Sequence, residues 1–149
     1  MVIVWLALGA ILTLPLLLIA KRINKTLWPH IFGVSLLVAA LIYIGFALAW
    51  GTTEWLFVEI LGVAIYGLFY MLAVRHTIVW LSAGWLLHPI WDVALHLLGP
   101  GTHIVPFWYA VACVSFDLVI ASFLVIEARH IKNAHNNKFN RGLGLRRAH

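Results

Sequence analysis

The chain has 149 residues, of which 64% are hydrophobic and only 10% are charged, and its mean hydropathy is +1.00. Soluble domains carry about 25% charged residues, so this composition excludes a soluble enzyme, a disordered chain and a collagen-like fibre. A single cysteine excludes a disulfide framework and a cysteine-rich zinc module. We therefore expect a polytopic membrane protein, small enough that most of the chain lies inside the bilayer.

Five apolar blocks are long enough to cross a membrane, since a transmembrane helix needs about 20 residues. They cover approximately residues 1–20, 31–50, 54–74, 78–98 and 106–126. Three of the four connections are short, which makes consecutive helices antiparallel neighbours. The sequence predicts an all-α fold with a five-helix transmembrane bundle over residues 1–126. A basic, largely disordered cytoplasmic tail is expected over residues 127–149.

The basic residues give this arrangement an orientation. All ten Lys and Arg residues follow the first, third or fifth block, on one side of a five-span bundle. Basic residues in short loops mark the cytoplasmic side, so we expect the N-terminus outside and the C-terminus inside. A four-span or six-span arrangement would break this segregation.

The ends of the blocks are typical of a multi-pass protein of the cell membrane, which in a bacterium is the inner membrane. Six of the eight tryptophans lie near the predicted span ends, as in an aromatic belt: Trp5, Trp28, Trp50, Trp55, Trp80 and Trp108. The first block has no basic segment before it and no small-residue cleavage site after it, so we expect an anchor rather than a signal peptide. The basic tail accounts for the net charge of +5. We interpret it as contacting lipid headgroups, not nucleic acid. The sequence leaves open whether the chain forms a homo-oligomer.

Five ionisable residues lie inside the predicted spans. His88, Asp92 and His96 recur every four residues in span four, which places them on one face of a helix. Asp117 lies near the middle of span five, and Glu59 lies in span three. A central Asp costs about 2.5–3.5 kcal/mol to insert, so five such groups exceed what packing requires. Counting depth at about 1.5 Å per residue, we expect them to converge on one polar cavity that opens towards the outer face.

Further residues fit such a cavity. Four aromatic side chains in spans three and four are candidate substrate-binding residues: Trp85, Trp91, Tyr66 and Tyr70. Tyr43 contributes from span two, and Pro89 removes a backbone hydrogen bond beside His88, which predicts a kink. Span one has Thr13 as its only polar side chain, so we expect it at the edge of the bundle.

The function we expect is acid–base catalysis inside the membrane on a lipophilic small molecule. A carboxyl group in a low-dielectric cavity favours its protonated form, which makes Asp92, Asp117 or Glu59 a candidate general acid. His88 and His96 are candidate proton acceptors, and tryptophan rings stabilise a developing positive charge. Such a site suits the isomerisation, cyclisation or hydration of an isoprenoid, sterol or quinone-like molecule.

The same residues leave two alternatives open. His88 with Asp92, or Asp92 with His96, has the spacing of two metal ligands, and Asp117 or Glu59 would supply the third. Histidine with carboxylates suits zinc or iron, so a metal-dependent membrane hydrolase or oxygenase follows. The other alternative is a proton or ion relay, or an accessory subunit that binds a pigment or haem, because chains of Asp, Glu and His mark proton pathways in membranes.

The segment from His88 to Asp92, followed by His96, has the pattern HPxWDxxxH. It resembles a segment of small, functionally uncharacterised bacterial integral membrane proteins of similar length. The resemblance covers mainly spans four and five. It implies a membrane protein and a bacterial origin, and it carries over no activity.

Overall fold

The computed structural model describes residues 1–142, and this part of the chain is helical without any strand. The elements are α1 (Val2–Leu12), α2 (Leu14–Arg22), the 3-10 helix η1 (Lys25–Leu27), α3 (Trp28–Trp50), α4 (Thr53–Arg75), α5 (Val79–Trp91), the π-helix η2 (Asp92–Leu97) and α6 (Phe107–Gly142). In the described part of the chain, four helical segments are long and apolar enough to cross a membrane: Val2–Arg22, Lys25–Trp50, Thr53–Arg75 and Phe107–Ala134. The prediction of an all-α fold is thereby confirmed for the described residues, and the four segments fit a membrane protein.

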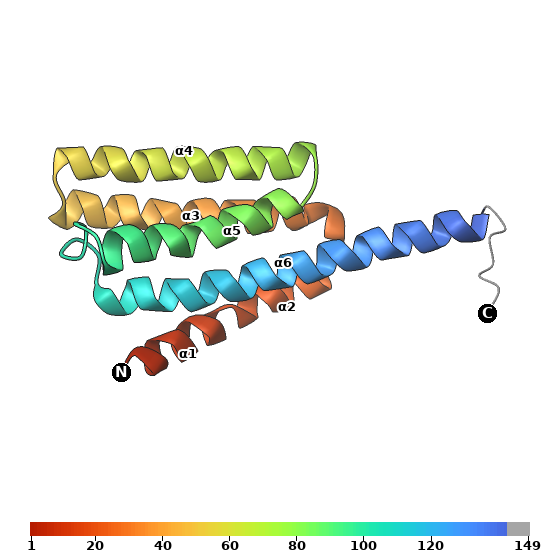
Figure 1. Cartoon of the computed structure of the whole chain (residues 1–149), viewed down its shortest axis with the longest axis horizontal. Helices are drawn as coiled ribbons and strands as arrows, with labels where there is room; N and C mark the ends of the chain where they lie inside the picture. Colours follow the sequence, from red (N-terminus) through yellow and green to blue (C-terminus); the bar gives the residue numbers. More distant parts are fainter. Residues whose placement is uncertain (143–149) are drawn as a thin grey trace.

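The helices form one bundle with a layer at its edge. Figure 1 shows α3, α4, α5 and α6 side by side, while α1 and α2 lie on the outer side of α6. Helix α6 extends well past the other helices at its C-terminal end. The first predicted span therefore lies at the edge of the bundle, where its single polar side chain led us to expect it.

The first predicted span consists of two helices, because Thr13 and Pro15 interrupt it. The Thr13 hydroxyl donates a hydrogen bond to the carbonyl oxygen of Ala10 (2.6 Å), and Pro15 occupies the first turn of α2, where its missing N–H costs least. Gly9 sets how closely α1 packs on α6, because a Cβ atom there would collide with the carbonyl oxygen of Ala112.

The fourth predicted span changes its helix type instead of stopping. Helix α5 contains Pro89, and from Asp92 the same helix continues as a π-helix to Leu97. Leu98 N–H donates to the carbonyl oxygen of Val93 (2.9 Å), five residues back. Proline leaves one α-helical hydrogen bond unmade, and π-turns are frequent at functional sites. The expected disturbance at Pro89 thus takes the form of a wider helical turn one residue beyond Trp91.

Helix α6 does not end at Ile126, where the last predicted span ends, but continues to Gly142. Near this point Lys25 and Glu127 form an ion pair (2.6 Å) that ties α6 to η1. Residues 127–142 of the predicted disordered tail are therefore helical, and residues 143–149 lie outside the described residues.

Two groups of buried hydrophobic side chains fill the bundle. The larger one joins α3, α4, α5 and α6 and includes Phe32, Leu36, Tyr66, Trp85 and Leu124. The smaller one surrounds Tyr43, Ile104, Val105 and Ala110. The ring of His88 contacts Tyr66 of the larger group and Tyr43 of the smaller one, with ring centroids 5.0 and 5.5 Å apart. His88, the first of the buried ionisable residues described below, thus lies where the two apolar groups meet.

Candidate functional site

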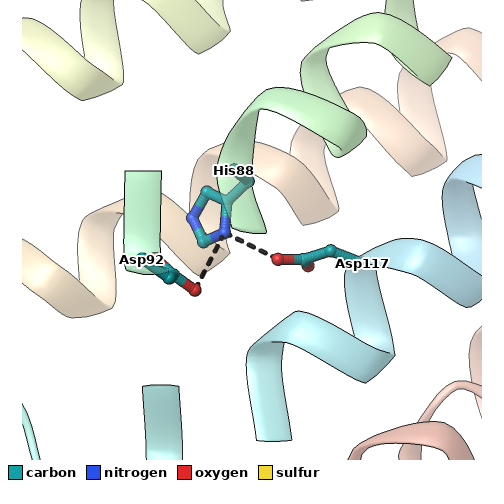
Figure 2. Close-up of side chains that lie close together, drawn as sticks. All are labelled: His88, Asp92 and Asp117. Atoms are coloured by element: carbon teal, nitrogen blue, oxygen red, sulfur yellow. Dashed lines mark hydrogen bonds and ion pairs between the residues drawn. The ribbon is translucent and has the colours of Figure 1, made fainter. Parts of the chain in front are cut away.

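Three ionisable side chains, from α5, η2 and α6, meet in the middle of the bundle, and we call them the His88 cluster. Figure 2 shows His88 of α5 between Asp92, the first residue of η2, and Asp117 of α6. Nδ1 of His88 lies 2.9 Å from Oδ2 of Asp117 and 3.6 Å from Oδ2 of Asp92. All three residues are at most 1% exposed, so the cluster is closed off from bulk water.

The hydrogen bond between His88 and Asp117 can run in either direction. When Asp117 is ionised, His88 Nδ1–H donates to its Oδ2 atom, and when Asp117 carries the proton, its O–H donates to the ring nitrogen. A proton can therefore pass between the two side chains without any movement of the helices. This is the geometry that an acid–base pair requires.

Asp92 is the least compensated member of the cluster. Neither of its carboxyl oxygens has a hydrogen-bond partner among the residues that the structure describes, although Asp92 is fully buried. A buried polar group without a partner costs free energy. The fold therefore keeps Asp92 beside His88 at a cost that packing alone does not explain.

A second buried pair, Glu59 of α4 with His96 of η2, lies nearer the loop that follows η2. Oε1 of Glu59 and Nε2 of His96 are 3.2 Å apart, and both residues are at most 3% exposed. Gly101 of the loop closes over the imidazole, since a Cβ atom at this glycine would lie 2.9 Å from Nδ1 of His96. The five predicted ionisable residues thus form two groups, three in the His88 cluster and two in the Glu59–His96 pair.

Tyr43 lies between these two groups. Its ring centroid is 5.5 Å from that of His88 and 4.8 Å from that of His96. Its hydroxyl is buried and has no hydrogen-bond partner in the described part of the chain. The sequence places Tyr43 towards the cavity but gives it no role, whereas the structure makes it the contact between the two polar groups.

The four candidate substrate-binding aromatics lie in three different surroundings. The ring of Tyr66 contacts that of His88, and the ring of Trp91 packs beside Tyr66 with centroids 6.5 Å apart. Trp85 is fully buried, and its ring packs against that of Phe116. These three aromatics line the polar groups or the apolar core beside them.

Tyr70 lies away from the ionisable residues. Its hydroxyl is hydrogen-bonded to Nδ1 of His30, at 2.8 Å, and its ring fills the space that Gly33 leaves open. Tyr70 follows Glu59 by eleven residues, which at about 1.5 Å per residue is more than 16 Å along α4. The sequence analysis grouped Tyr70 with the cavity residues, but Tyr70 lies at a different depth along α4 from Glu59.

A cavity of about 620 Å³ lies between α1, α2, α3 and α6, and its lining includes Asp117 but not His88. Its wall is apolar apart from a few groups, among them Asp117, Cys113 and Ser35. Asp117 is the one residue of the five ionisable ones that lines it. This differs from the single polar cavity expected from the sequence, because the ionisable side chains pair with each other and fill the space between their own helices.

The residues of α3 that line this cavity were missed by the sequence analysis. Ser35 and Ala39 are four residues apart and hence on one face of α3, and small side chains there leave space beside the helix. The spacing of these small residues in the second span was the feature of the sequence that could have indicated the cavity.

The His88 cluster also has the composition of a metal site. One ligand atom from each of His88, Asp92 and Asp117 lies within 4.8 Å of the other two. A zinc ion binds such nitrogen and oxygen atoms at about 2.0–2.2 Å, so small side-chain rotations would bring all three into its reach. His96, which the sequence offered as a further candidate ligand, pairs with Glu59 instead.

Comparison with known proteins places the chain in a family. Residues 3–130 match a family of unknown function, DUF6010. The chain belongs to this family. No curated protein and no solved structure matches it. The match covers the helices that carry both polar groups, without singling out the HPxWDxxxH segment on which the sequence resemblance was based.

Proposed function

We propose that this DUF6010 member is an intramembrane enzyme that acts by acid–base chemistry on a lipophilic small molecule, with Asp117 and His88 as the reacting pair. One observation carries the proposal: Asp117 is among the residues that line the apolar cavity, and its carboxyl group is hydrogen-bonded to His88. A molecule in the cavity therefore meets a carboxyl group whose proton exchanges with a buried imidazole.

The proposal includes five membrane crossings, with the N-terminus outside and the C-terminus in the cytoplasm. Helix α5 and η2 form one uninterrupted helix from Val79 to Leu97, and this helix packs beside α4 and α6. This helix carries His88, Asp92 and His96, which would thereby lie inside the membrane-spanning part of the chain. The segregation of all Lys and Arg residues to one side of five spans supports the orientation.

In the proposed reaction, protonated Asp117 adds its proton to a carbon–carbon double bond of the substrate. The O–H bond breaks, a C–H bond forms, and a positive charge develops on the neighbouring carbon. Loss of a proton from an adjacent carbon to the Asp117 carboxylate, which exchanges protons with His88, gives an isomer. Attack by a second double bond of the substrate gives a ring and moves the charge to another carbon, and loss of a proton from there to the Asp117 carboxylate gives a neutral product. Addition of water, followed by loss of a proton from its oxygen to the Asp117 carboxylate, gives an alcohol. These are the isomerase, cyclase and hydratase outcomes of one initial proton transfer.

The surroundings support each part of this scheme. The rings of Trp108, Tyr109 and Phe116 line the cavity, and aromatic faces stabilise a developing cation. Asp92 lies 3.6 Å from Nδ1 of His88 and stabilises the imidazolium form. The rings of Tyr43 and Tyr66 cover the imidazole and keep water from the pair.

The experiment that tests this proposal is deuterium transfer from solvent. The purified protein in nanodiscs is incubated in D₂O with the lipid extract of native cells that lack its gene, where the substrate accumulates. We expect mass spectrometry to find carbon-bound deuterium in one lipophilic component. Asp117→Asn should abolish the transfer, while Glu54→Gln, which changes an exposed carboxyl on α4, should not. No transfer by the wild-type protein, or equal transfer by Asp117→Asn, would overturn it.

A metal-dependent hydrolase or oxygenase is the second candidate, favoured by the convergence of three ligand atoms within 4.8 Å. Elemental analysis of protein purified without chelators or a His tag decides between the two. About one zinc or iron per chain, lost in His88→Ala/Asp92→Ala and kept in Glu59→Gln, would favour the metal enzyme. Absence of bound metal from the wild-type protein would remove this candidate.

A further inference from the structure

We infer that the cavity between α1, α2, α3 and α6 binds a single-chain lipid with an uncharged polar end group, such as an alcohol or an aldehyde. The lipid enters sideways from the bilayer, between α1–α2 and α3, and its polar end lies at Asp117. This inference rests on the proposed function only for the reaction that follows binding. The binding itself is argued from the cavity.

The cavity has its mouth towards the surrounding bilayer. Leu12 of α1 and Val38 and Ile42 of α3 all line it, and they are 54%, 51% and 40% exposed. These side chains therefore belong both to the cavity wall and to the outer, lipid-facing surface of the bundle. A molecule dissolved in the bilayer reaches the cavity without crossing water.

The dimensions of the cavity suit one hydrocarbon chain. On α6 the lining runs from Trp108 to Asp117, which is roughly 14 Å at 1.5 Å per residue. The volume of about 620 Å³ lies within the range of roughly 300–1,000 Å³ that is typical of pockets for small ligands. A lipid with two long chains and a large headgroup is bulkier than such a pocket allows.

The polar groups lie towards one end of the cavity. Asp117 is at the end of the α6 lining, and Ser35 is near the start of the α3 lining; because α3 and α6 run antiparallel to each other across the bundle, these two ends coincide. Cys113 lies one turn from Asp117 on the same helix. An amphiphile would therefore lie with its chain towards Trp108 and its end group at Asp117.

The charge of the lining selects an uncharged end group. Among the described residues, no Lys or Arg lines the cavity, while the His88 cluster, to which Asp117 belongs, has two carboxyl groups for one imidazole. An anionic headgroup would be repelled by these carboxyls, and an ammonium group would lose its hydration in a buried site. A hydroxyl or carbonyl group avoids both costs and can hydrogen-bond to Asp117 and Ser35.

Photo-crosslinking tests the inference directly. A long-chain alcohol with a diazirine in its chain is added to the protein in nanodiscs and irradiated, and the modified peptides are mapped by mass spectrometry. We expect labelling of cavity residues on α1–α2, α3 and α6. An excess of unmodified alcohol should lower this labelling at least about five-fold, as competition for a single binding site would. Labelling of outward-facing residues on α4, such as Ile60, should not be lowered.

Two matched variants sharpen the result. Ala39→Phe places a ring in the cavity and should abolish the competed labelling, while Ala64→Phe, at an exposed position of α4, should leave it unchanged. Val38→Trp at the mouth of the cavity serves the same purpose if Ala39→Phe does not fold. The inference would be overturned if the alcohol did not compete with the label, or if neither Ala39→Phe nor Val38→Trp changed the competed labelling. It would also be overturned if an alkylammonium ion or a fatty acid competed more strongly than the alcohol.

This test and the deuterium test fail separately. Competed labelling without deuterium transfer would keep the lipid site and reject the enzyme. Deuterium transfer without competed labelling would keep the enzyme and reject this cavity as its substrate site.

Discussion

The His88 cluster and the Glu59–His96 pair are both buried in the same bundle, yet they differ in balance and in surroundings. In the pair, one carboxyl faces one imidazole at 3.2 Å, and neither residue lines the described cavity. In the His88 cluster, two carboxyls face one imidazole, and Asp117 lines the cavity. The comparison separates two uses of buried charge. A balanced pair suffices to join α4 to η2, whereas an excess carboxyl at a cavity wall is suited to chemistry.

The largest expected effect separates the two histidines. His88→Gln should lower deuterium transfer by at least about 100-fold, since a positioned acid or base contributes typically 10²–10⁴-fold. His96→Gln should lower it by less than about 5-fold, because His96 contacts Glu59 rather than Asp117. Rates measured on equal amounts of folded protein check this. A larger loss in His96→Gln than in His88→Gln would reverse the roles of the two groups.

Stability should respond in the opposite way. Glu59→Ala leaves His96 buried without its partner, and removing one member of a buried pair costs about 3–5 kcal/mol. Asp92→Asn removes a buried carboxylate that has no hydrogen-bond partner among the described residues, so we expect it to be neutral or stabilising. Denaturant unfolding in detergent measures both. A larger loss of stability in Asp92→Asn than in Glu59→Ala would contradict this comparison.

A smaller effect is expected where α1 meets α6 and closes the cavity. Gly9→Ala forces a Cβ atom against the Ala112 carbonyl, and overpacking of this kind costs about 1–3 kcal/mol. Gly45→Ala on α3 is the matched control, because its Cβ atom would meet open space. We expect Gly9→Ala to weaken the competed photo-labelling and Gly45→Ala to leave it unchanged. Equal behaviour of the two variants would contradict the role of α1 as a cavity wall.

The smallest expected effect concerns Tyr43, which touches both polar groups. Tyr43→Phe keeps the ring contacts with His88 and His96 and removes only a hydroxyl without a partner in the described residues. We expect deuterium transfer within about 3-fold of wild type and a change in stability of about 1 kcal/mol or less. A loss of activity as large as that of His88→Gln would make this hydroxyl part of the reacting group.

The sequence predicts the helices well because apolar runs of sufficient length have few other structures available. It does not predict the interruption at Thr13, the π-helix after Trp91 or the continuation of α6 beyond Ile126. The first two depend on hydrogen bonds that local apolar composition does not encode. The third depends on a polar segment that remains helical although its composition suggests disorder.

For the site, residue counting led us to expect that the five ionisable residues converge, and two of them, His88 and Asp117, are hydrogen-bonded in the structure. Counting along a helix gives depth but not rotation about the helix axis. It therefore could not divide the ionisable residues into a cluster and a pair. Nor could it place the cavity on the far side of α6, because that depends on how α1 packs against Ala112.

The most direct test of the central claim compares two carboxyl variants in one deuterium-transfer experiment. Asp117 and Glu59 are both buried, and a carboxyl oxygen of each lies 2.9 or 3.2 Å from an imidazole nitrogen, so burial and distance to the imidazole are closely matched. The account predicts that Asp117→Asn retains less than about 1% of the wild-type transfer, and that Glu59→Gln retains at least about one third. Equal losses in both variants, or full transfer by Asp117→Asn, would contradict it.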